Sequence, residues 1–144
     1  MSVYQHLLIA TDLSDENQIV IEQGLAIANA FGSAVSLLHV VEPLPGYGYA
    51  YVGIADIEVE LREEALKKIH RLAEKYSIPQ DRCHVTVGPI KVELKDVIKN
   101  NSIDCLVLGS HGRHGLSELL GSTAHAAVHS APCDVMTVRI KGKI

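Results

Sequence analysis

The sequence predicts a three-layer α/β domain, with a five-stranded, mainly parallel sheet and helices on both faces. Short apolar runs recur along the chain and suit strands that are covered on both faces, as in a parallel sheet. Segments with a helical spacing of apolar residues separate these runs, and such alternation builds a parallel sheet through right-handed crossovers. A length of 144 residues suits one such domain with a buried core, so residues 1–144 are expected to form a single domain.

The first strand is expected at residues 3–10, where the run VYQHLLIA is largely apolar. A short turn follows it. Ser14 is expected as the N-cap of a helix over about residues 14–31, because a serine hydroxyl suits that position and two acidic residues follow it in the first turn. Gly32 stands where helices commonly end in a glycine.

The second strand is expected at residues 34–41, where AVSLLHVV repeats the buried-strand pattern. It stops before Pro43, because proline cannot continue the hydrogen bonding of a central strand. Residues 42–55 contain two prolines, three glycines and three tyrosines without a helical period, which predicts an irregular loop and the most mobile element of the chain.

A second helix is expected at residues 56–76, where apolar residues recur at intervals of three or four. This stripe is expected to face the sheet and consists of Ile57, Leu61, Ala65, Ile69, Leu72 and Tyr76. The remaining elements are, in chain order, a turn at 77–81, a strand at 83–87, a helix over about 90–100, a strand at 103–108, a helix at about 117–130 and a strand at 134–140.

Composition and charge narrow the possible partners. The formal net charge of −4 provides no basic surplus for a nucleic-acid backbone, so nucleic acid is not an expected partner. The apolar run near the N-terminus is far too short to span a membrane and has none of the features of a signal peptide, so no membrane insertion and a cytoplasmic location are expected. The three cysteines form no CxxC pair and are expected to be reduced thiols.

A glycine-rich stretch, GSHGRHGLSELLGST at residues 109–123, lies between a predicted strand and a predicted helix. Backbone amides at such a position can cradle an anion, and Gly109 and Gly112 would let the main chain approach a phosphate closely. Gly121 would bring a further close approach, with two neighbouring hydroxyls as donors. Such a loop suits a triphosphate. From the spacing alone, a tight turn without a ligand is an equal alternative.

Other phosphate-binding and phosphotransfer patterns do not match. No lysine follows these glycines as a Walker A loop requires, and the turn after the first strand, ATDLSDE, has no glycine for a dinucleotide fold. Asp15 and Glu16 would also repel phosphate there. A receiver domain would end its third strand in aspartate, whereas this strand ends in Val87-Gly88. In open parallel sheets ligands lie beyond the carboxyl ends of strands, and Asp12 follows such an end.

The chain resembles the universal stress protein family over nearly its whole length. The matching segments are HLLIATDLS, SLLHVVEP, VGPI and IDCLVLGSHGRHGLSELLGSTAHAAVHSAPCDVMTV. Nucleotide-binding members of that family carry a G-x2-G-x9-G-[ST] pattern, which Gly109, Gly112 and Gly121-Ser122 match in order. The spacing departs by one residue, since only eight residues separate Gly112 from Gly121. Removing one residue before a helix rotates the residues that follow by about 100°. A loop that contains Gly115 can absorb this rotation.

The resemblance implies that the chain binds ATP, with magnesium. The residues placed at the nucleotide are Ala10, Thr11, Asp12, Val40, Leu108, Gly109, Gly112, Arg113, Gly121, Ser122 and Thr123. In that arrangement Val40 contacts adenine through its backbone, and Asp12 accepts from ribose hydroxyls or helps to hold the magnesium ion. Asp12 as a local turn cap, and Arg113 as an ordinary surface arginine rather than a phosphate contact, are the alternatives.

Family members typically form homodimers through their last strand, and Val135–Ile140 is a suitable edge for such pairing. The implied function is that of an ATP-binding stress-response regulator, a nucleotide-dependent homodimeric switch that acts on an unknown protein. A non-nucleotide interaction protein of the same fold, favoured by the short glycine spacing, is one alternative. A slow ATPase is the other, although no water-positioning base or phosphate-cradling lysine is evident.

His125 and His129 would share one face of the last predicted helix. A metal site needs three or four converging ligands, and the sequence between them supplies no carboxylate, so we expect surface or interface histidines rather than a metal site. Cys105 lies inside a predicted strand and is expected to be a small buried residue without redox chemistry.

Overall fold

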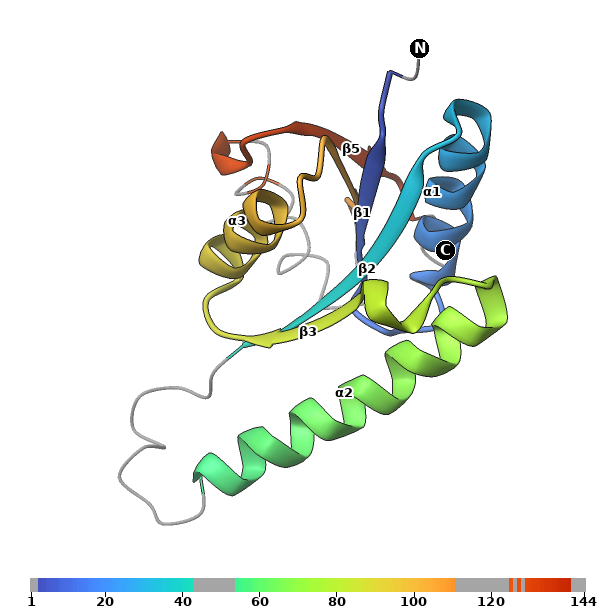
Figure 1. Cartoon of the computed structure of the whole chain (residues 1–144). Helices are drawn as coiled ribbons and strands as arrows, with labels where there is room; N and C mark the ends of the chain where they lie inside the picture. The colour runs from blue at the N-terminus through green and yellow to red at the C-terminus, as the bar shows by residue number, and fades with distance from the viewer. Residues whose placement is uncertain (1–2, 43–53, 111–124, 126, 128, 141–144) are drawn as a thin grey trace.

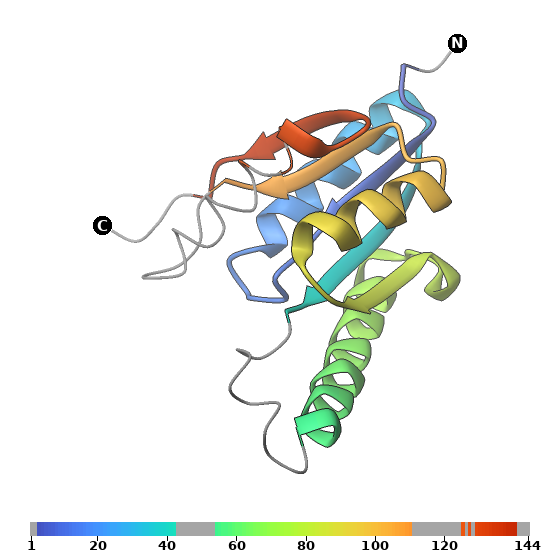
Figure 2. The same ribbon diagram turned by 90° about the vertical axis from the view of Figure 1, so that its left-hand side faces the viewer.

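The computed structural model describes residues 3–42, 54–110, 125, 127 and 129–140. Five strands form one sheet in the order β3-β2-β1-β4-β5, and every neighbouring pair is parallel. The strands are β1 (His6–Ala10), β2 (Ala34–Val41), β3 (Cys83–Val87), β4 (Cys105–Gly109) and β5 (Asp134–Val138). The three-layer α/β fold that the sequence predicts is confirmed, and Figures 1 and 2 show helices on both faces of the twisted sheet.

Two hydrophobic layers sandwich the sheet because successive strand residues point to opposite faces. On one face, Leu7 and Ile9 of β1 pack with α1 (Gln18–Phe31) and α2 (Ile54–Tyr76). On the other, Leu8 packs with α3 (Ile90–Asn100) and with Ala127, which lies in a helical segment. The apolar runs of the sequence are thus strands buried on both sides.

The start of α1 differs from the prediction. The helix begins at Gln18 with Asn17 as its N-cap, so Ser14 is not the cap, and no acidic residue lies in the first turn. The reason lies in Asp12, whose carboxylate accepts hydrogen bonds from both the amide and the hydroxyl of Ser14 and holds it in a preceding turn. The predicted end is confirmed, since Gly32 adopts a left-handed φ of 68° and its N–H bonds to the carbonyl of Ala28.

The apolar stripe of α2 meets the sheet only along its second half. Ala65 is 5% exposed and Ile69 fully buried, whereas Ile57 and Leu61 are 44% and 43% exposed. Figures 1 and 2 show why: the helix runs past the end of the sheet, so its first half has no strand beneath it. The prediction that the whole stripe faces the sheet is therefore wrong for that half.

The other boundaries shift by a few residues. A short 3-10 helix (Gln80–Arg82) closes the predicted turn at 77–81, β4 begins at Cys105 rather than 103, and β5 ends at Val138 rather than 140. Residues 125, 127, 129 and 130 are helical, as predicted. Most of the loop predicted at 42–55 and most of the glycine-rich stretch lie outside the described residues. Among the described helices, none has the length and apolar composition needed to cross a membrane.

Candidate ligand site at the carboxyl ends of the strands

The order of the strands reverses between β1 and β4, because the chain builds β2 and β3 on one side of β1 and then β4 and β5 on the other. Ile9 pairs with Val107 in this central register. The residues that follow, Ala10 to Asp12 on one strand and Leu108 and Gly109 on the other, therefore meet at the carboxyl edge. This crevice is where open α/β sheets bind ligands.

The structure brings part of the predicted site together. Val40 joins the same edge from β2, whose Leu38 carbonyl accepts a hydrogen bond from the Thr11 amide at 2.9 Å. Thr11 and Leu108 are buried, and both backbone polar atoms of Thr11 already take part in hydrogen bonds, its amide with Leu38 and its carbonyl oxygen with His39. The predicted residues Gly112, Arg113, Gly121, Ser122 and Thr123 lie outside the described residues.

Asp12 forms a tight polar turn at the end of β1. Its Oδ1 accepts from the Ser14 amide at 2.9 Å and from the Ser14 hydroxyl at 2.6 Å. Between them, Leu13 has a φ of 67°, a conformation that leucine rarely adopts. Oδ1 of Asp12 therefore caps the local turn, which is one of the two roles expected for this residue. Oδ2 has no hydrogen-bond partner among the described residues and remains available to a ligand.

Gly109 ends β4 in a close-packed corner. A Cβ atom there would lie 2.7 Å from Cδ1 of Ile140 and 3.3 Å from both Nδ2 of Asn17 and Cγ2 of Val20. A side chain at this position would therefore require the end of the Ile140 side chain to move, and the other two neighbours to give slightly. Asn17, only 1% exposed, also keeps its Oδ1 without a hydrogen-bond partner at the start of α1.

A cavity of about 330 Å³ opens between the ends of β1 and β2 and the helix α2. Its lining combines apolar walls with charged and polar groups, and consists of Asp12, Leu13, Ser14, His39, Val41, Leu61, Glu64, Ala65 and Lys68. This volume falls in the range of small-molecule sites, about 300–1,000 Å³. Asp12 is the predicted site residue that borders it.

His39 lines this cavity but is not among the site residues that the sequence predicts. Its Nδ1 lies 2.8 Å from the carbonyl oxygen of Thr11. Burial lowers the pKa of His39 and so does the charge of Lys68, although the Thr11 carbonyl and Asp12 oppose them. The signal was a polar residue, one of two with Ser36, inside the otherwise apolar strand AVSLLHVV, and it suits a satisfied core histidine equally well.

The carboxylate of Asp12 has the chemistry of a magnesium ligand. Magnesium usually takes one or two protein carboxylates and completes its shell with water and phosphate oxygens, and Oδ2 of Asp12 is a carboxylate oxygen of that kind. The described residues contain no group of three or more His, Cys, Asp or Glu side chains that could hold a metal ion by themselves.

His125 and His129 lie edge to face, with ring centroids 4.5 Å apart.

Comparison with known proteins decides the family. The model of the universal stress protein family matches residues 3–139. The chain is 39% identical over 145 residues to universal stress protein A homolog 2 of Coxiella burnetii (strain RSA 493 / Nine Mile phase I), covering 99% of each protein. The chain belongs to the universal stress protein family. The resemblance inferred from the sequence segments is thereby confirmed.

Solved structures confirm the universal stress protein fold. The hypothetical protein MJ0577 superposes with a TM-score of 0.78 at 23% identity, over 97% of this chain and 99% of that one. A universal stress protein in complex with cAMP superposes with a TM-score of 0.60 at 22% identity, over 98% and 100% of the two chains. At these identities the likeness establishes the common architecture.

Proposed function

We propose that this universal stress protein binds an adenine nucleotide, ATP with magnesium, at the carboxyl ends of β1, β2 and β4, and works as a nucleotide-responsive regulator of another protein. The observation that carries the proposal is the cavity at this edge, where apolar walls adjoin a carboxylate oxygen of Asp12 that no described residue uses. A structural neighbour of the same family holds cAMP, an adenine nucleotide.

Each part of the nucleotide has a proposed partner. Apolar walls suit the base, and the charged Asp12 suits ribose hydroxyls or the magnesium ion. The phosphates are assigned to the glycine-rich stretch that begins at Gly109, where backbone amides would donate to their oxygens. Bound magnesium would neutralise part of the phosphate charge beside Asp12.

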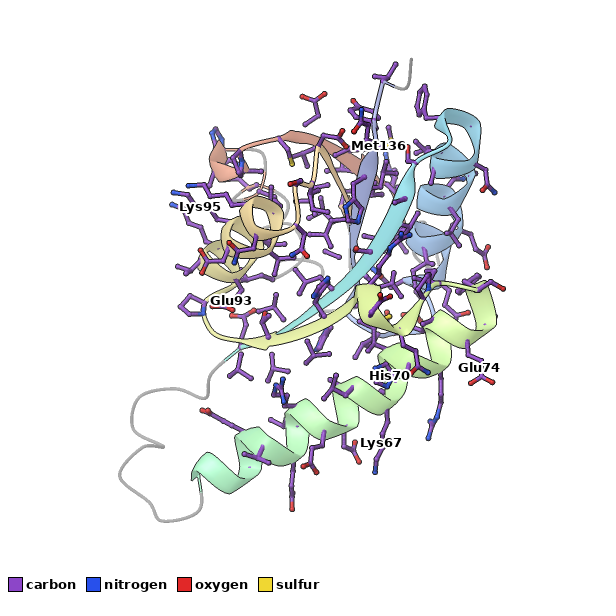
Figure 3. All side chains as sticks on the ribbon, viewed as in Figure 1. Lys67, His70, Glu74, Glu93, Lys95 and Met136 are labelled. Carbon is purple, nitrogen blue, oxygen red and sulfur yellow. The ribbon has the colours of Figure 1, made fainter. Side chains whose placement is uncertain are left out.

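The homodimer is part of the proposal and would form at β5. This strand pairs with β4 along one edge, and it ends the described sheet. Met136 of β5 is 36% exposed, and Figure 3 labels it on this strand. An open, apolar edge strand favours pairing with a second copy. We also propose a single domain over residues 1–144 and a cytoplasmic location, which the three free thiols support.

Nucleotide binding would regulate a partner only through unequal affinity for two conformations of the protein. The predicted loop at residues 42–55 is the proposed responding element, and it lies almost wholly outside the described residues. For the slow-ATPase alternative, the groups of the cavity lining that could activate water are Asp12, His39 and Glu64.

The Asp12→Asn variant tests the site. Its amide oxygen can still accept from Ser14 and keep the turn, while the negative charge is lost. We expect ATP with magnesium to bind about tenfold more weakly in calorimetry, because hydrogen bonds to charged groups contribute about 1.5–3 kcal/mol. Asp15→Asn, the matched control, should leave the affinity unchanged. Equal affinities of Asp12→Asn and the unmodified protein would refute the site.

A second candidate function, that of an interaction protein without a nucleotide, is favoured by the exposed apolar residues on the first half of α2. These residues are Ile57, Val59 and Leu61. Figure 3 shows Lys67 and Glu74 on the side of α2 that is turned away from the sheet. If this candidate were correct, ATP would release no heat on mixing, and Ile57→Glu would abolish binding of a purified partner.

A further inference from the structure

The apolar row of α2 continues beyond the sheet that it covers. Ile57, Leu61, Ala65 and Ile69 follow one another at intervals of four residues, so they form one row along the helix. Their exposed fractions fall from 44% and 43% to 5% and then to zero. The first two members therefore have the pattern of a packed helix face, but no strand lies beneath them (Figures 1 and 2).

An open hollow of about 490 Å³ lies beside this part of α2. The described residues that line the hollow are Ile57, Glu60, Leu61, Glu63, Glu64 and Lys67. Two of them, Leu61 and Glu64, also line the ligand cavity at the strand ends, so the hollow and the cavity adjoin. A partner seated in the hollow would share this wall with a ligand bound in the cavity.

The charge around the hollow is mainly negative. Glu60, Glu63 and Glu64 contribute three carboxylates, and Lys67 is the single basic residue of the described lining. Glu60 and Glu64 are about one helical turn apart, a spacing at which like charges repel and destabilise a helix. Basic side chains of a partner would relieve this repulsion, whereas acidic side chains would add to it.

The secondary structure of a suitable partner follows from that of the surface. Away from its ends, the backbone N–H and C=O groups of α2 are bonded within the helix, so its side offers no edge to which a strand could add. A partner helix satisfies its own backbone groups. It can place apolar side chains on such a surface at intervals of three and four residues.

We propose that the first half of α2 is a docking surface for a basic, amphipathic helix of another protein. The apolar side of that helix packs on Ile57 and Leu61, and its basic side chains face Glu60 and Glu64. The partner helix thereby takes the place that strands occupy beneath the second half of α2. This specifies the partner of the regulator proposed above, and its link to regulation rests on that proposed function.

The probe for the test is a synthetic helical peptide that carries a fluorophore, with leucines along one side at intervals of three and four residues and lysines beside them. One matched peptide has glutamates in place of the lysines, and another has the same residues in scrambled order. Fluorescence anisotropy measures the affinity of the whole protein for each peptide. The lysine peptide should bind about tenfold more tightly than either matched peptide, and more weakly as the salt concentration rises.

Two pairs of variants locate the binding surface. Ile57→Gln removes an apolar anchor and should weaken binding of the lysine peptide about tenfold. Val59→Gln is its control, because Val59 is 55% exposed but lies about 200° further round the helix. Glu60→Gln removes one carboxylate and should weaken binding about two- to fivefold. Its control is Glu74→Gln, on the side of α2 that is turned away from the sheet, which should leave the affinity unchanged.

Three outcomes would overturn the docking surface. The first is equal affinity for the lysine and glutamate peptides, and the second is equal affinity of the Ile57→Gln and Val59→Gln proteins for the lysine peptide. The third is a change of oligomeric state in Ile57→Gln, measured by sedimentation, because the surface would then join copies of this chain.

Titration of the same protein with ATP and magnesium separates this proposal from the proposed function. Binding of ATP without binding of the lysine peptide would refute the docking surface alone. Binding of the lysine peptide without binding of ATP would refute the nucleotide function and support the docking surface.

Discussion

The two ends of the parallel sheet use histidine differently. At the amino end, Nδ1 of His6 donates to the Asn101 carbonyl at 3.1 Å, and Nε2 lies 2.7 Å from the Ser36 hydroxyl, which can donate to it. At the carboxyl end, His39 makes one such bond, to Thr11, and its ring borders a cavity. At the amino end, both ring nitrogens of the histidine have hydrogen-bond partners. At the carboxyl end, one ring nitrogen has no partner among the described residues and can bond to a ligand.

The amino end is closed by backbone contacts as well. The carboxylate of Asp104 accepts from the amides of Gln5 at 2.8 Å and His6 at 3.0 Å, which joins the starts of β1 and β4. Tyr4 donates to Asp134 at 2.9 Å nearby, and this bond is the main reason that the pKa of Tyr4 rises to about 12. These groups serve stability, so changes at this end should affect folding rather than ligand binding.

The largest effect is expected from Asp104→Ala. Two backbone amides would lose a charged acceptor, which should lower the free energy of unfolding by about 2 kcal/mol. Urea unfolding measures this, and nucleotide affinity measured on the folded protein should not change. Asp96→Ala, on the exposed side of α3, is the control. An unaltered unfolding midpoint for Asp104→Ala, or a loss of ligand affinity, would contradict the claim that groups at the amino end of the sheet serve stability and not ligand binding.

A smaller effect is expected from pH. Burial lowers the pKa values of His6, His39 and His84 from the usual 6.5. The unfolded chain therefore binds protons first as the pH falls, and the folded protein is favoured most above about pH 6.5 and loses stability below it. Urea unfolding between about pH 8 and pH 5 should show this decline. His6→Gln should make the decline shallower, and an identical slope in that variant would contradict the account of His6.

Some elements could be predicted closely because local signals bound them. The bounds of β2 and β3 were correct, since each apolar run ends at a proline or glycine. The start of α1 was predicted wrongly. Ser14 can either cap the helix or bond to Asp12, and which of the two it does depends on how the turn folds. The exposure of Ile57 could not be predicted either, since periodicity identifies an apolar face but not what covers it.

The candidate site was predictable in the same uneven way. Asp12 could be singled out because it follows a predicted strand, and strand ends are where such folds bind ligands. His39 could not, because only the pairing of β1 with β2 brings its ring to Thr11 and only the placement of α2 makes a cavity beside it. The close packing around Gly109 likewise involves Asn17 and Ile140, which are distant in sequence.

The central claim is that the carboxyl end of the sheet holds an adenine nucleotide. The most direct measurement is to denature the purified protein, identify any released nucleotide by chromatography, and titrate the emptied and refolded protein with ATP and magnesium in a calorimeter. The account predicts saturable, stoichiometric binding of ATP, with or without co-purified nucleotide. No released nucleotide together with no heat at high ATP concentration would contradict it.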